Sequence, residues 1–599
     1  MCAIFGILGD YNENIAKSAL AKLSHRGPDY CGIVQKERLF FAHQRLSIQD
    51  THSRSHQPLK HQNILLSFNG EIYNFKELKQ ELAFNYETQS DSEVIIAAYL
   101  KWGIDFVQHL RGMFAIALLD GDTLYLFRDR LGKKPLFYLD GNSFIFASEI
   151  KALVPFLKKI DMDDDALLSY LSFLTPTPPF TFFKNIHKLG AGEYLTYKNQ
   201  QVEVKYYYDI LNTTPNIITH KDEAISKLQT TLEDSMSLRL NANVPMAALL
   251  SGGIDSATIN YYAKKQGLDI PTYTLGYKEF AKYDERVNAR ESAEYLGVTN
   301  RQVEIDQEQF INATESVFES MDEPLNDPAA IPLYLLFKEI KKDGYKVVMS
   351  GEGSDELFLG YRQYFEYLDI QAAGNLAHKN WLKKYFRANF SMNREWEWYK
   401  RIFDDTLLFR TSGDKFTDLQ KNSLMRRNIK DNQSLKYLQP YRDRFESSAH
   451  SDESMWYSYI DLNIFQSEHF LTKLDRVSMA HSIESRTPFL DHKLVETIFS
   501  LSPKLRYEDG VPKSLLKEIM KPKLSAEILQ RKKKGFANPY MEYLLNSKKI
   551  ELIKEVNKET GMFRTDKLDE YIQTASRGSF KQHIWGLYVL SYWIKKNLL

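Results

Sequence analysis

The sequence has 599 residues, which is enough for two domains of unequal size or for three. Its 78 Lys and Arg residues balance its 78 Asp and Glu residues, so no overall charge attracts nucleic acid or an anionic membrane surface. With two cysteines, no signal peptide and no apolar stretch that could cross a bilayer, the sequence predicts a cytoplasmic globular protein without nucleic-acid or membrane partners.

The chain begins with an apolar run, residues 2–8, that predicts a buried strand. Because initiator methionine is normally removed before a small residue, we expect Cys2 to become the mature N-terminus. Its α-amine titrates near neutrality and can serve as general base for its own thiol. The plain alternative is that Cys2 is only a small buried hydrophobic residue.

A few predicted helices and many predicted strands fill the first 150 residues. The helices are expected at 15–23 and 94–100, and the strands at 64–68, 113–119, 123–128, 135–139 and 143–148. This pattern is typical of an α+β layered domain. Residues 151–220 connect it to the second half, and residues 212–216 are the best linker candidate, so we place the boundary near residue 210.

Five short motifs follow one another in this first domain, namely MCAIFG, HRGPD, HQRLSI, FNGEIYN and QSDSEV. In this order they resemble the glutaminase domain of glutamine amidotransferases with an N-terminal cysteine nucleophile, which implies a layered αββα fold. Each motif alone has a plain explanation. Arg45 could form a surface ion pair, Asp91 could be an N-cap, and Asn69-Gly70 could be a hairpin turn.

The resemblance implies a role for each matching residue. Cys2 would attack the side-chain amide of glutamine, and Asn69 with the backbone amide of Gly70 would form the oxyanion hole. An arginine would bind the α-carboxylate of glutamine with its planar guanidinium, and two acids would receive the α-ammonium. The residues expected to bind glutamine are Arg45, Ile48, Asn69, Glu71 and Asp91.

The second half opens on LLSGGIDS, residues 249–256. A strand is predicted at 244–250, a turn at Ser251-Gly252-Gly253 and a helix from Ala257 to Gln266. The free amides at a helix start bind phosphate, and glycines let the backbone approach it. Asp255 would lie in the first turn, where a carboxylate can hold Mg²⁺. The alternative is a tight turn that is capped by Ser251.

Further strands, predicted at 270–277, 301–305 and 347–349, alternate with helices at 284–296 and 331–341. This alternation indicates a doubly wound parallel α/β sheet, which binds ligands at the carboxyl ends of its strands. Two strands end in Ser-Gly loops that carry acids, Asp255 and Asp355. Facing acids can share Mg²⁺ between the phosphates of ATP.

LLSGGIDS is similar to the pyrophosphate loop of ATP pyrophosphatases. Together with SGEGSDELF and with KLDRVSMAHSIESRTPFLD at 473–491, it resembles the glutamine-hydrolysing asparagine synthetases. The resemblance covers nearly the whole chain and is loosest over 362–460, within a helical C-terminal part that ends in a docked apolar helix. It implies domains at 1–210 and 211–599.

By this resemblance Lys513 is the catalytic lysine near the α-phosphate, where its ammonium neutralises developing charge. Glu352 would deprotonate ammonia or orient the acceptor, and Asp255 and Asp355 would hold Mg²⁺. The segment 531–536 would close near the nucleotide, although a solvated charge run is its plain alternative. The residues expected to bind ATP are Leu249, Ser251, Gly252, Gly253, Asp255, Ser256, Leu275, Ser350 and Gly351.

The implied function is asparagine synthesis from aspartate, glutamine and ATP, through a β-aspartyl-AMP intermediate and with release of AMP and pyrophosphate. Leu359 stands where the family usually has glycine, which leaves the shape of the acceptor pocket open. The alternatives are the same chemistry on another carboxylate, such as a sugar acid, and a non-catalytic protein that senses nucleotide. A homodimer is also left open.

Overall fold

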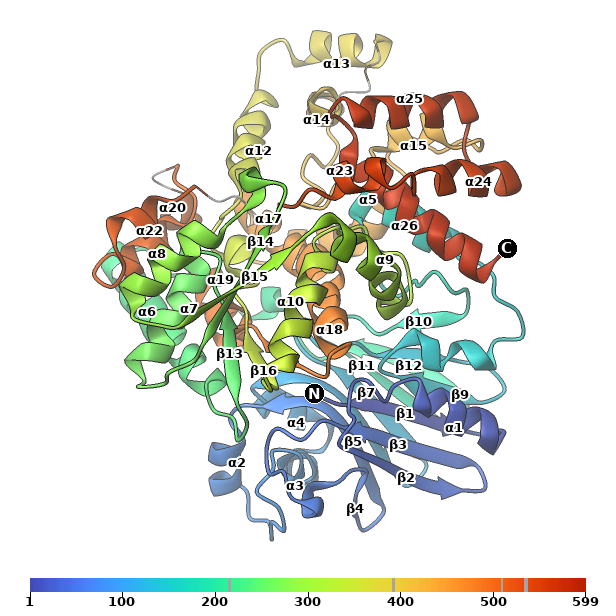
Figure 1. Ribbon diagram of the computed structural model, residues 1–599, viewed down its shortest axis with the longest axis vertical. Helices are drawn as coiled ribbons and strands as arrows, with labels where there is room; N and C mark the ends of the chain where they lie inside the picture. The colour runs from blue at the N-terminus through green and yellow to red at the C-terminus, as the bar shows by residue number, and fades with distance from the viewer. Residues whose placement is uncertain (214–216, 390, 392–393, 508–509, 533–536) are drawn as a thin grey trace.

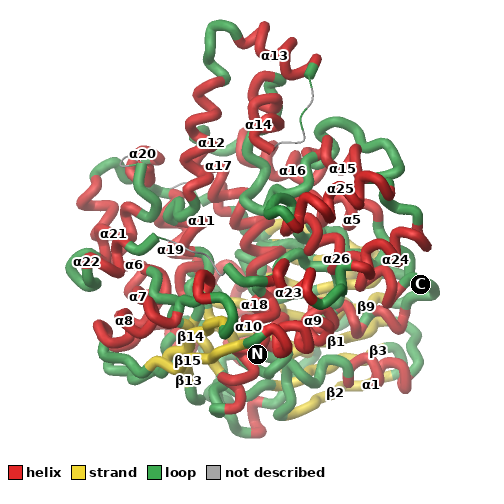
Figure 2. Tube along the Cα trace, turned by 45° about the horizontal axis from the view of Figure 1, so that its top comes forward, coloured by secondary structure: helices red, strands yellow, loops and turns green. Residues whose placement is uncertain are grey.

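The computed structural model describes residues 1–599 except 214–216, 390, 392–393, 508–509 and 533–536. Two six-stranded sheets come first in the chain, and a five-stranded sheet with many helices follows. In Figure 1 the N-terminal part lies below the helix-rich C-terminal part, and Figure 2 shows how far helices dominate the latter. In the described part of the chain, every helix is too short or too polar to span a bilayer.

The first sheet is antiparallel and has the strand order β10-β8-β9-β1-β3-β2. Strand β1 is central, between β3 and β9, so Cys2 directly precedes a strand that has a partner on each side. The strands are β1 (Ala3–Leu8), β2 (Tyr30–Lys36), β3 (Leu39–Arg45), β8 (Phe137–Leu139), β9 (Phe144–Ala147) and β10 (Ile186–Lys188).

The second sheet is also antiparallel, with the order β12-β11-β7-β6-β5-β4. The prediction that residues 151–220 only connect the two halves is wrong, because strands from this segment complete both sheets. Strand β12 is mostly exposed, so it lacks the apolar alternation by which strands are recognised. The strands are β4 (Leu59–His61), β5 (Ile64–Ile72), β6 (Gly112–Asp120), β7 (Thr123–Arg128), β11 (Glu193–Lys198) and β12 (Gln201–Tyr206).

Apolar side chains bind the two sheets to each other and to helices on their outer faces. Phe41 and Phe146 of the first sheet share a buried cluster with Leu126 of the second. Helices α2 (Phe75–Glu81), α3 (Glu93–Trp102) and α4 (Phe106–His109) cover the second sheet, and α1 (Glu13–Ala21) covers the first. The predicted αββα layering is confirmed.

The third sheet is parallel, with the order β15-β14-β13-β16-β17. The chain runs outward from β13 to β15 and then returns to the other side of β13 to form β16. Right-handed crossovers therefore place helices on both faces, as in the doubly wound fold predicted. The strands are β13 (Met246–Leu249), β14 (Thr272–Tyr277), β15 (Asn300–Ile305), β16 (Val347–Met349) and β17 (Glu484–Arg486).

Helices make up most of the remaining chain, and the predicted apolar C-terminal helix is present as α26, with Ile584, Trp585 and Leu587 buried. The helices, including the π-helix η7, are α5 (Asp164–Phe173), α6 (Lys221–Arg239), α7 (Ile254–Lys265), α8 (Arg286–Leu296), α9 (Gln307–Met321), α10 (Ala330–Lys342), α11 (Ser354–Leu357), α12 (Arg362–Ala373), α13 (Lys379–Ala388), α14 (Arg394–Phe403), α15 (Asp418–Leu424), α16 (Leu435–Glu446), α17 (Glu453–Ile460), η7 (Asp461–Phe470), α18 (Leu471–Met479), α19 (His492–Phe499), α20 (Pro503–Tyr507), α21 (Ser514–Met520), α22 (Ala526–Gln530), α23 (Tyr540–Asn546), α24 (Glu551–Thr560), α25 (Thr565–Ser576) and α26 (Lys581–Asn597).

Buried ion pairs join the N-terminal sheets to the C-terminal part. Arg26 Nη1 lies 2.7 Å from Asp475 Oδ2, and its Nη2 donates to Oδ1 of the same carboxylate at 3.1 Å. Arg128 Nη1 lies 2.9 Å from Glu468 Oε1. All four side chains are at most 3% exposed, so these contacts are fully desolvated and fix how the two parts meet.

Candidate active sites

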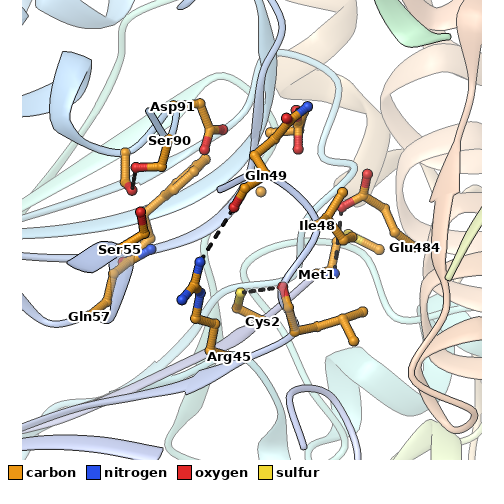
Figure 3. Close-up of a pocket in the computed structure, with 15 residues that line it drawn as sticks. Met1, Cys2, Arg45, Ile48, Gln49, Ser55, Gln57, Ser90, Asp91 and Glu484 are labelled. Atoms are coloured by element: carbon orange, nitrogen blue, oxygen red, sulfur yellow. Dashed lines mark hydrogen bonds and ion pairs between the residues drawn. The ribbon is translucent and has the colours of Figure 1, made fainter. Parts of the chain in front are cut away.

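A pocket around Cys2 gathers residues from five separate segments of the chain (Figure 3). Of the residues predicted to act on glutamine, all but Asn69 line it, and Asn69 contacts Cys2 directly: its Oδ1 accepts a hydrogen bond from the Cys2 amide at 3.0 Å. The lining of this Cys2 pocket is Met1, Cys2, Arg45, Leu46, Ile48, Gln49, Ser55, Gln57, Phe68, Gly70, Glu71, Ser90, Asp91, Ser92 and Glu484.

Strand β5 supplies Asn69, Gly70 and Glu71. The strand was predicted to end at Phe68, and this is wrong, because pairing with β6 continues to Ile72. Gly70 is needed there, since a Cβ at this position would lie 2.1 Å from the Met113 carbonyl oxygen on β6. The hairpin-turn alternative for Asn69-Gly70 is therefore excluded.

The Cys2 side chain is buried, and its Sγ lies 3.8 Å from the carbonyl oxygen of Leu46. Burial raises the pKa of its thiol. The side-chain Nδ2 of Asn69 is also buried and has no hydrogen-bond acceptor among the described residues. A buried donor without an acceptor costs free energy, so this amide is suited to an oxygen that a substrate brings.

Met1 precedes Cys2 in the described chain, so the nitrogen of Cys2 is an amide here. The terminal ammonium is on Met1 and lies 3.5 Å from Glu484 Oε2 (Figure 3). Burial lowers the pKa of that ammonium. The predicted general base, the α-amine of Cys2, requires removal of Met1.

Arg45 is held by backbone carbonyls. Its guanidinium donates to the oxygens of His52 at 3.0 Å, Gln49 at 3.3 Å and Asp50 at 2.6 Å. No carboxylate of the described residues pairs with it, although Arg45 is only 4% exposed. Its positive charge is thus oriented but uncompensated, which favours binding of an anionic group in the pocket.

Two buried acids face the same pocket. Asp91 Oδ2 accepts from the Ile72 amide at 2.8 Å, and Glu71 Oε1 accepts from Gln49 Nε2 at 2.8 Å. Burial raises the pKa of Asp91 to about 6. Burial also raises the pKa of Glu71 well above its usual value, against the opposing effect of the Arg486 guanidinium. A cationic partner would stabilise the charged forms of both acids.

The LLSGGIDS loop connects β13 to α7 as a strand-turn-helix unit. The helix was predicted to start at Ala257, but it starts at Ile254, so Asp255 lies in its first turn. Gly253 is the N-cap residue and has no side chain to cap the helix. Ser251 Oγ accepts from the Gly253 amide at 3.5 Å, so the turn has the Ser251 contact of the plain alternative. Ser251 also interacts with Ser256, whose Oγ accepts from the Ser251 amide at 3.1 Å.

Lys513 joins the two acid loops at the carboxyl ends of β13 and β16. Its Nζ lies 2.5 Å from Asp255 Oδ2 and 2.9 Å from Asp355 Oδ1, and Ser354 Oγ donates to Asp255 Oδ1 at 2.6 Å. Burial disfavours the Lys513 ammonium, but the two carboxylates outweigh it and raise its pKa. This acid–lysine cluster of Asp255, Asp355 and Lys513 lies at the switch point of the sheet, where such folds bind ligands.

Comparison with known proteins identifies the family. A model described as "Asparagine synthase" matches residues 227–595, and one described as "Glutamine amidotransferase domain" matches residues 1–208. The chain belongs to the asparagine synthase family. It is accordingly a ligase with an amidotransferase domain.

Three relatives illustrate the range of the family. Asparagine synthetase (glutamine-hydrolyzing) 1 of Bacillus subtilis (strain 168) is 31% identical, over 100% of this chain and 97% of that protein. A putative asparagine synthetase (glutamine-hydrolyzing) of Mycobacterium tuberculosis (strain ATCC 25618 / H37Rv) is 32% identical, over 88% and 85%. Amidase chry2 of Gibberella zeae is 28% identical, over 91% and 88%.

The departure of this chain from the asparagine synthase pattern at Leu359 has a structural setting. Leu359 is fully buried and has a φ of 50°, a left-handed conformation that glycine adopts without strain. The next residue, Gly360, is essential for space, because a Cβ there would lie 2.1 Å from Asp355 Oδ1 and 2.4 Å from Lys513 Cε. This segment therefore packs directly behind the acid–lysine cluster.

The acid–lysine cluster fits a divalent cation in chemistry. Within the described ranges no three His, Cys, Asp or Glu side chains gather to hold a metal. Mg²⁺ usually takes only one or two carboxylates and completes its shell with water and substrate phosphates. Asp255 and Asp355 both contact one positive charge, the Lys513 ammonium, so their carboxylates are close enough to share a cation.

The other residues expected to bind ATP lie on the strands and loops next to this cluster. Gly351 packs against Asp255, since a Cβ at Gly351 would lie 3.2 Å from Asp255 Cβ. Leu249 ends β13 and is half-buried, and Leu275 is buried in the neighbouring β14. The amide of Ser350 donates to the Arg486 carbonyl at 2.9 Å. Glu352 lies on the same loop; burial disfavours the Lys473 ammonium, but the charge of Asp327, helped by that of Glu352, raises its pKa.

Arg531 contacts and supports the LLSGGIDS loop. Its Nη1 donates to the carbonyl oxygens of Gly252 at 2.9 Å and Asn288 at 2.7 Å, and so ties the loop to α8. Gly252 has a φ of 81° and packs against Asn288, where a Cβ would lie 2.7 Å from the backbone. The expectation that segment 531–536 closes near a nucleotide stays a prediction: Arg531 contacts the loop, and residues 533–536 lie outside the described residues.

Several pocket residues escape prediction from sequence. Gln49 bridges Glu71 and the Asn241 carbonyl, at 2.8 and 3.2 Å. Glu484 reaches the Cys2 pocket from β17, and no local pattern predicts a contact over that sequence distance. The polar residues Ser55, Gln57, Ser90 and Ser92 also line the pocket.

Proposed function

We propose that this protein is a glutamine-dependent asparagine synthetase with two active sites on one chain. The observation that supports this most directly is the convergence of Cys2, Arg45, Glu71 and Asp91 on one pocket. The acid–lysine cluster supports the second site. The chain would divide into a glutaminase domain, 1–210, and a synthetase domain, 211–599.

In the first site, Cys2 Sγ would attack the side-chain carbonyl carbon of glutamine. The resulting oxyanion would be held by Asn69 Nδ2 and the Gly70 amide, because preorganised donors stabilise charge that appears only in the transition state. Arg45 would bind the α-carboxylate, Glu71 and Asp91 would bind the α-ammonium, and Ile48 would flank the ligand. The C–N bond then breaks, ammonia leaves, and water hydrolyses the thioester to glutamate.

The proton of the Cys2 thiol needs a base close by. After removal of Met1, the α-amine of Cys2 would take this proton and pass it to the leaving nitrogen. The hydrogen bond between the Cys2 nitrogen and Asn69 Oδ1, 3.0 Å, would then orient that amine. The buried setting keeps the thiol protonated at rest, so proton transfer and attack would be coupled.

In the second site, the loop Ser251–Ser256 would hold the β- and γ-phosphates of ATP. The amides of Gly252 and Gly253 and the first turn of α7 supply donors there, which is a common anion-binding arrangement. Leu249 and Leu275 would flank the adenosine, and Ser350 and Gly351 would close the other side. Mg²⁺ held by Asp255 and Asp355 would neutralise phosphate charge.

Adenylation would join the β-carboxylate of aspartate to the α-phosphorus with loss of pyrophosphate. Lys513 would stabilise the charge that builds on the α-phosphoryl group, because its ammonium is held cationic between two acids. Ammonia then attacks the acyl carbon, AMP leaves, and Glu352 would orient the acceptor or take the proton that ammonia loses.

Ammonia would have to travel between the sites without meeting bulk water, where it is protonated. The contact region between the two domains supports such a path, since it holds the apolar side chains Met1, Leu46, Met113, Val347 and Met479 in one buried cluster.

One assay tests the proposal. Purified protein receives glutamine, aspartate, ATP and Mg²⁺, and asparagine, glutamate, AMP and pyrophosphate are quantified. Equal amounts of asparagine and pyrophosphate are expected. Absence of both, with ammonium as an alternative nitrogen source also inactive, would refute the synthetase assignment.

A second candidate keeps the chemistry but uses another carboxylate as acceptor. The left-handed Leu359 behind the acid–lysine cluster supports it, because this position can reshape the acceptor pocket. A relative named as an amidase, 28% identical, supports it too. Pyrophosphate release with a panel of amino-acid and sugar carboxylates separates the two candidates, because the true acceptor gives the highest kcat/KM.

A further inference from the structure

Arg486 lies where the two parts of the molecule meet and contacts both. It is the last residue of β17 and is fully buried. Its Nε donates to Glu484 Oε1 at 2.7 Å, and its Nη1 donates to the carbonyl oxygens of Arg239 and Asn241, at 2.8 and 2.7 Å. These contacts leave Nη2 as the one guanidinium nitrogen that is turned to a different partner.

That partner is Glu71 in the Cys2 pocket. Arg486 Nη2 lies 3.4 Å from Glu71 Oε2, too far and too poorly aligned for a hydrogen bond, so the two groups form a loose ion pair. The other oxygen of Glu71 is fixed by Gln49. Among the described residues Arg486 is therefore the cation that accompanies this acid, which is only 3% exposed.

The charge of Glu71 depends on this neighbour. Burial, followed by the nearby carboxylates of Asp91 and Glu484, raises the pKa of Glu71, and the guanidinium of Arg486 and the hydrogen bond from Gln49 act in the opposite direction. A protonated Glu71 would lose the electrostatic attraction for an ammonium group. The Arg239 guanidinium lies over the ring of Tyr73 and pairs with Asp491, so it does not replace Arg486.

The backbone of Arg486 reaches the second site. Its carbonyl oxygen accepts from the amide of Ser350 at 2.9 Å, at the start of the loop that carries Glu352 and Asp355. Parallel pairing with β16 fixes this contact, because Met349 and Arg486 are register partners. One residue thus connects the first acid of the Cys2 pocket with the acid loop of the nucleotide site.

We propose that Arg486 is a positioning residue for glutamine: its guanidinium orients Glu71 and favours the carboxylate form that receives the α-ammonium, so that a strand of the synthetase domain completes glutamine recognition. This inference rests on the proposed glutaminase function. It deepens that function, since the specificity of the N-terminal site for an α-amino group then depends on a residue of the C-terminal domain.

The test compares glutamine with its des-amino analogue, 4-carbamoylbutanoate, as glutaminase substrates of the full chain. The variants are Arg486→Met, which keeps an unbranched stem without the charge, and Arg486→Lys, which keeps the charge without the planar guanidinium. In the wild type, glutamine should be preferred by about 100-fold or more in kcat/KM, because a buried acid without its ammonium partner is costly.

Arg486→Met should lower this preference by about 10-fold or more through a higher KM for glutamine, with kcat and the use of the analogue nearly unchanged. Arg486→Lys should recover part of the preference. Arg128→Met is the matched control, since it removes another buried arginine at the domain contact, whose carboxylate partner, Glu468, is not part of the Cys2 pocket lining. It should lower stability while the preference stays as in the wild type.

The outcomes distinguish failure of the proposed glutaminase function from failure of the role assigned to Arg486. If the wild type hydrolyses neither substrate, the proposed function fails. If the wild type prefers glutamine and Arg486→Met keeps that preference, only the role of Arg486 fails. Should Arg486→Met not fold, Arg486→Lys decides: an unchanged preference ratio overturns the role, and a reduced ratio with wild-type melting temperature supports it.

Discussion

The ammonium of Lys513 donates to both carboxylate oxygens of Asp255, at 2.6 and 2.5 Å. This contact joins residues that are 258 positions apart, and it places the lysine where two acid loops converge. In the proposed complex with ATP, phosphates and Mg²⁺ would share this position with the ammonium. Lys513 would then exchange partners, because its donors cannot serve the acids and the phosphates equally.

Substitution of Lys513 should separate the two half-reactions. Lys513→Met should lower pyrophosphate release by about 10²–10³-fold, the range typical of a lost charge-stabilising donor. Glutamine hydrolysis should persist, because Lys513 is not part of the Cys2 pocket. Pyrophosphate and glutamate are measured in the same reaction. Equal loss of both products would contradict two independent sites.

Gly360→Ala tests the packing behind the cluster without removing any charge. The added Cβ would lie 2.1 Å from Asp355 Oδ1, so the acid and Lys513 must shift. A shift of about 1 Å can cost about 10²-fold in rate, and we expect that effect on asparagine formation. Gly267→Ala is the control for a glycine-to-alanine change, because no atom lies within 4 Å of a Cβ there, although its φ of 75° adds some strain. Its activity should match the wild type.

Cys2→Ala should abolish glutamine-dependent synthesis and leave ammonium-dependent synthesis intact. A chain with lysine inserted between Met1 and Cys2 should behave in the same way, because the large second residue prevents methionine removal and Cys2 then has no α-amine. Asparagine is measured with glutamine or ammonium as nitrogen source. If the extended chain used glutamine at the wild-type rate, the α-amine could not be the general base.

The pH dependence of glutamine use should reflect the buried acids. Burial raises the pKa of Asp91 to about 6. The carboxyl group of Asp91 also interacts electrostatically with Glu71, Glu484 and Arg486. Since the α-ammonium of glutamine needs the ionised acid, kcat/KM for glutamine should fall as pH decreases through about 6. Ammonium-dependent synthesis, scored as the relative change over the same pH range, is the control. A flat glutamine profile between pH 5 and 7 would count against this role.

Asp475→Asn should destabilise the fold, because it removes one of the two carboxylate charges, those of Asp475 and Glu149, that pair with the fully buried Arg26. Breaking a buried ion pair from one side costs about 3–5 kcal/mol in free energy of unfolding. Asp122→Asn makes the same chemical change in an exposed contact, 3.8 Å from Lys198, and should cost almost nothing. Denaturant or thermal unfolding compares the two variants. Equal effects would mean that the Arg26–Asp475 contact does not hold the domains together.

The sequence predicts the elements with strong apolar patterns, such as β7 at Thr123–Arg128, and the layered and doubly wound classes. It fails where pattern and structure differ. Gly70 reads as a turn, yet close approach to Met113 requires glycine inside a strand. Strand β12 carries too few buried residues to be recognised. The start of α7 at Ile254 lacks a capping side chain, so the Gly-Gly turn hides it.

The candidate sites show the same limit. Ordered motifs allow Cys2, Arg45 and Asp91 to be assigned to one site, and the structure brings them to one pocket. Glu484 and Arg486 belong to the same region only through the pairing of β17 with β16. Sequence separation of that size carries no local signal, so a contact across domains becomes visible only in three dimensions.

The contacts of Arg26 with Asp475 and of Glu71 with Arg486 have a consequence for biosynthesis. The sheets that carry Cys2 leave the ribosome hundreds of residues before β17 is translated, and domains generally fold in that order. An N-terminal domain that folds early would thus lack Glu484 and Arg486. The growing chain would bind glutamine selectively only once the proposed synthetase domain, which would use the ammonia, has also been made. This order would limit wasteful hydrolysis of glutamine during translation.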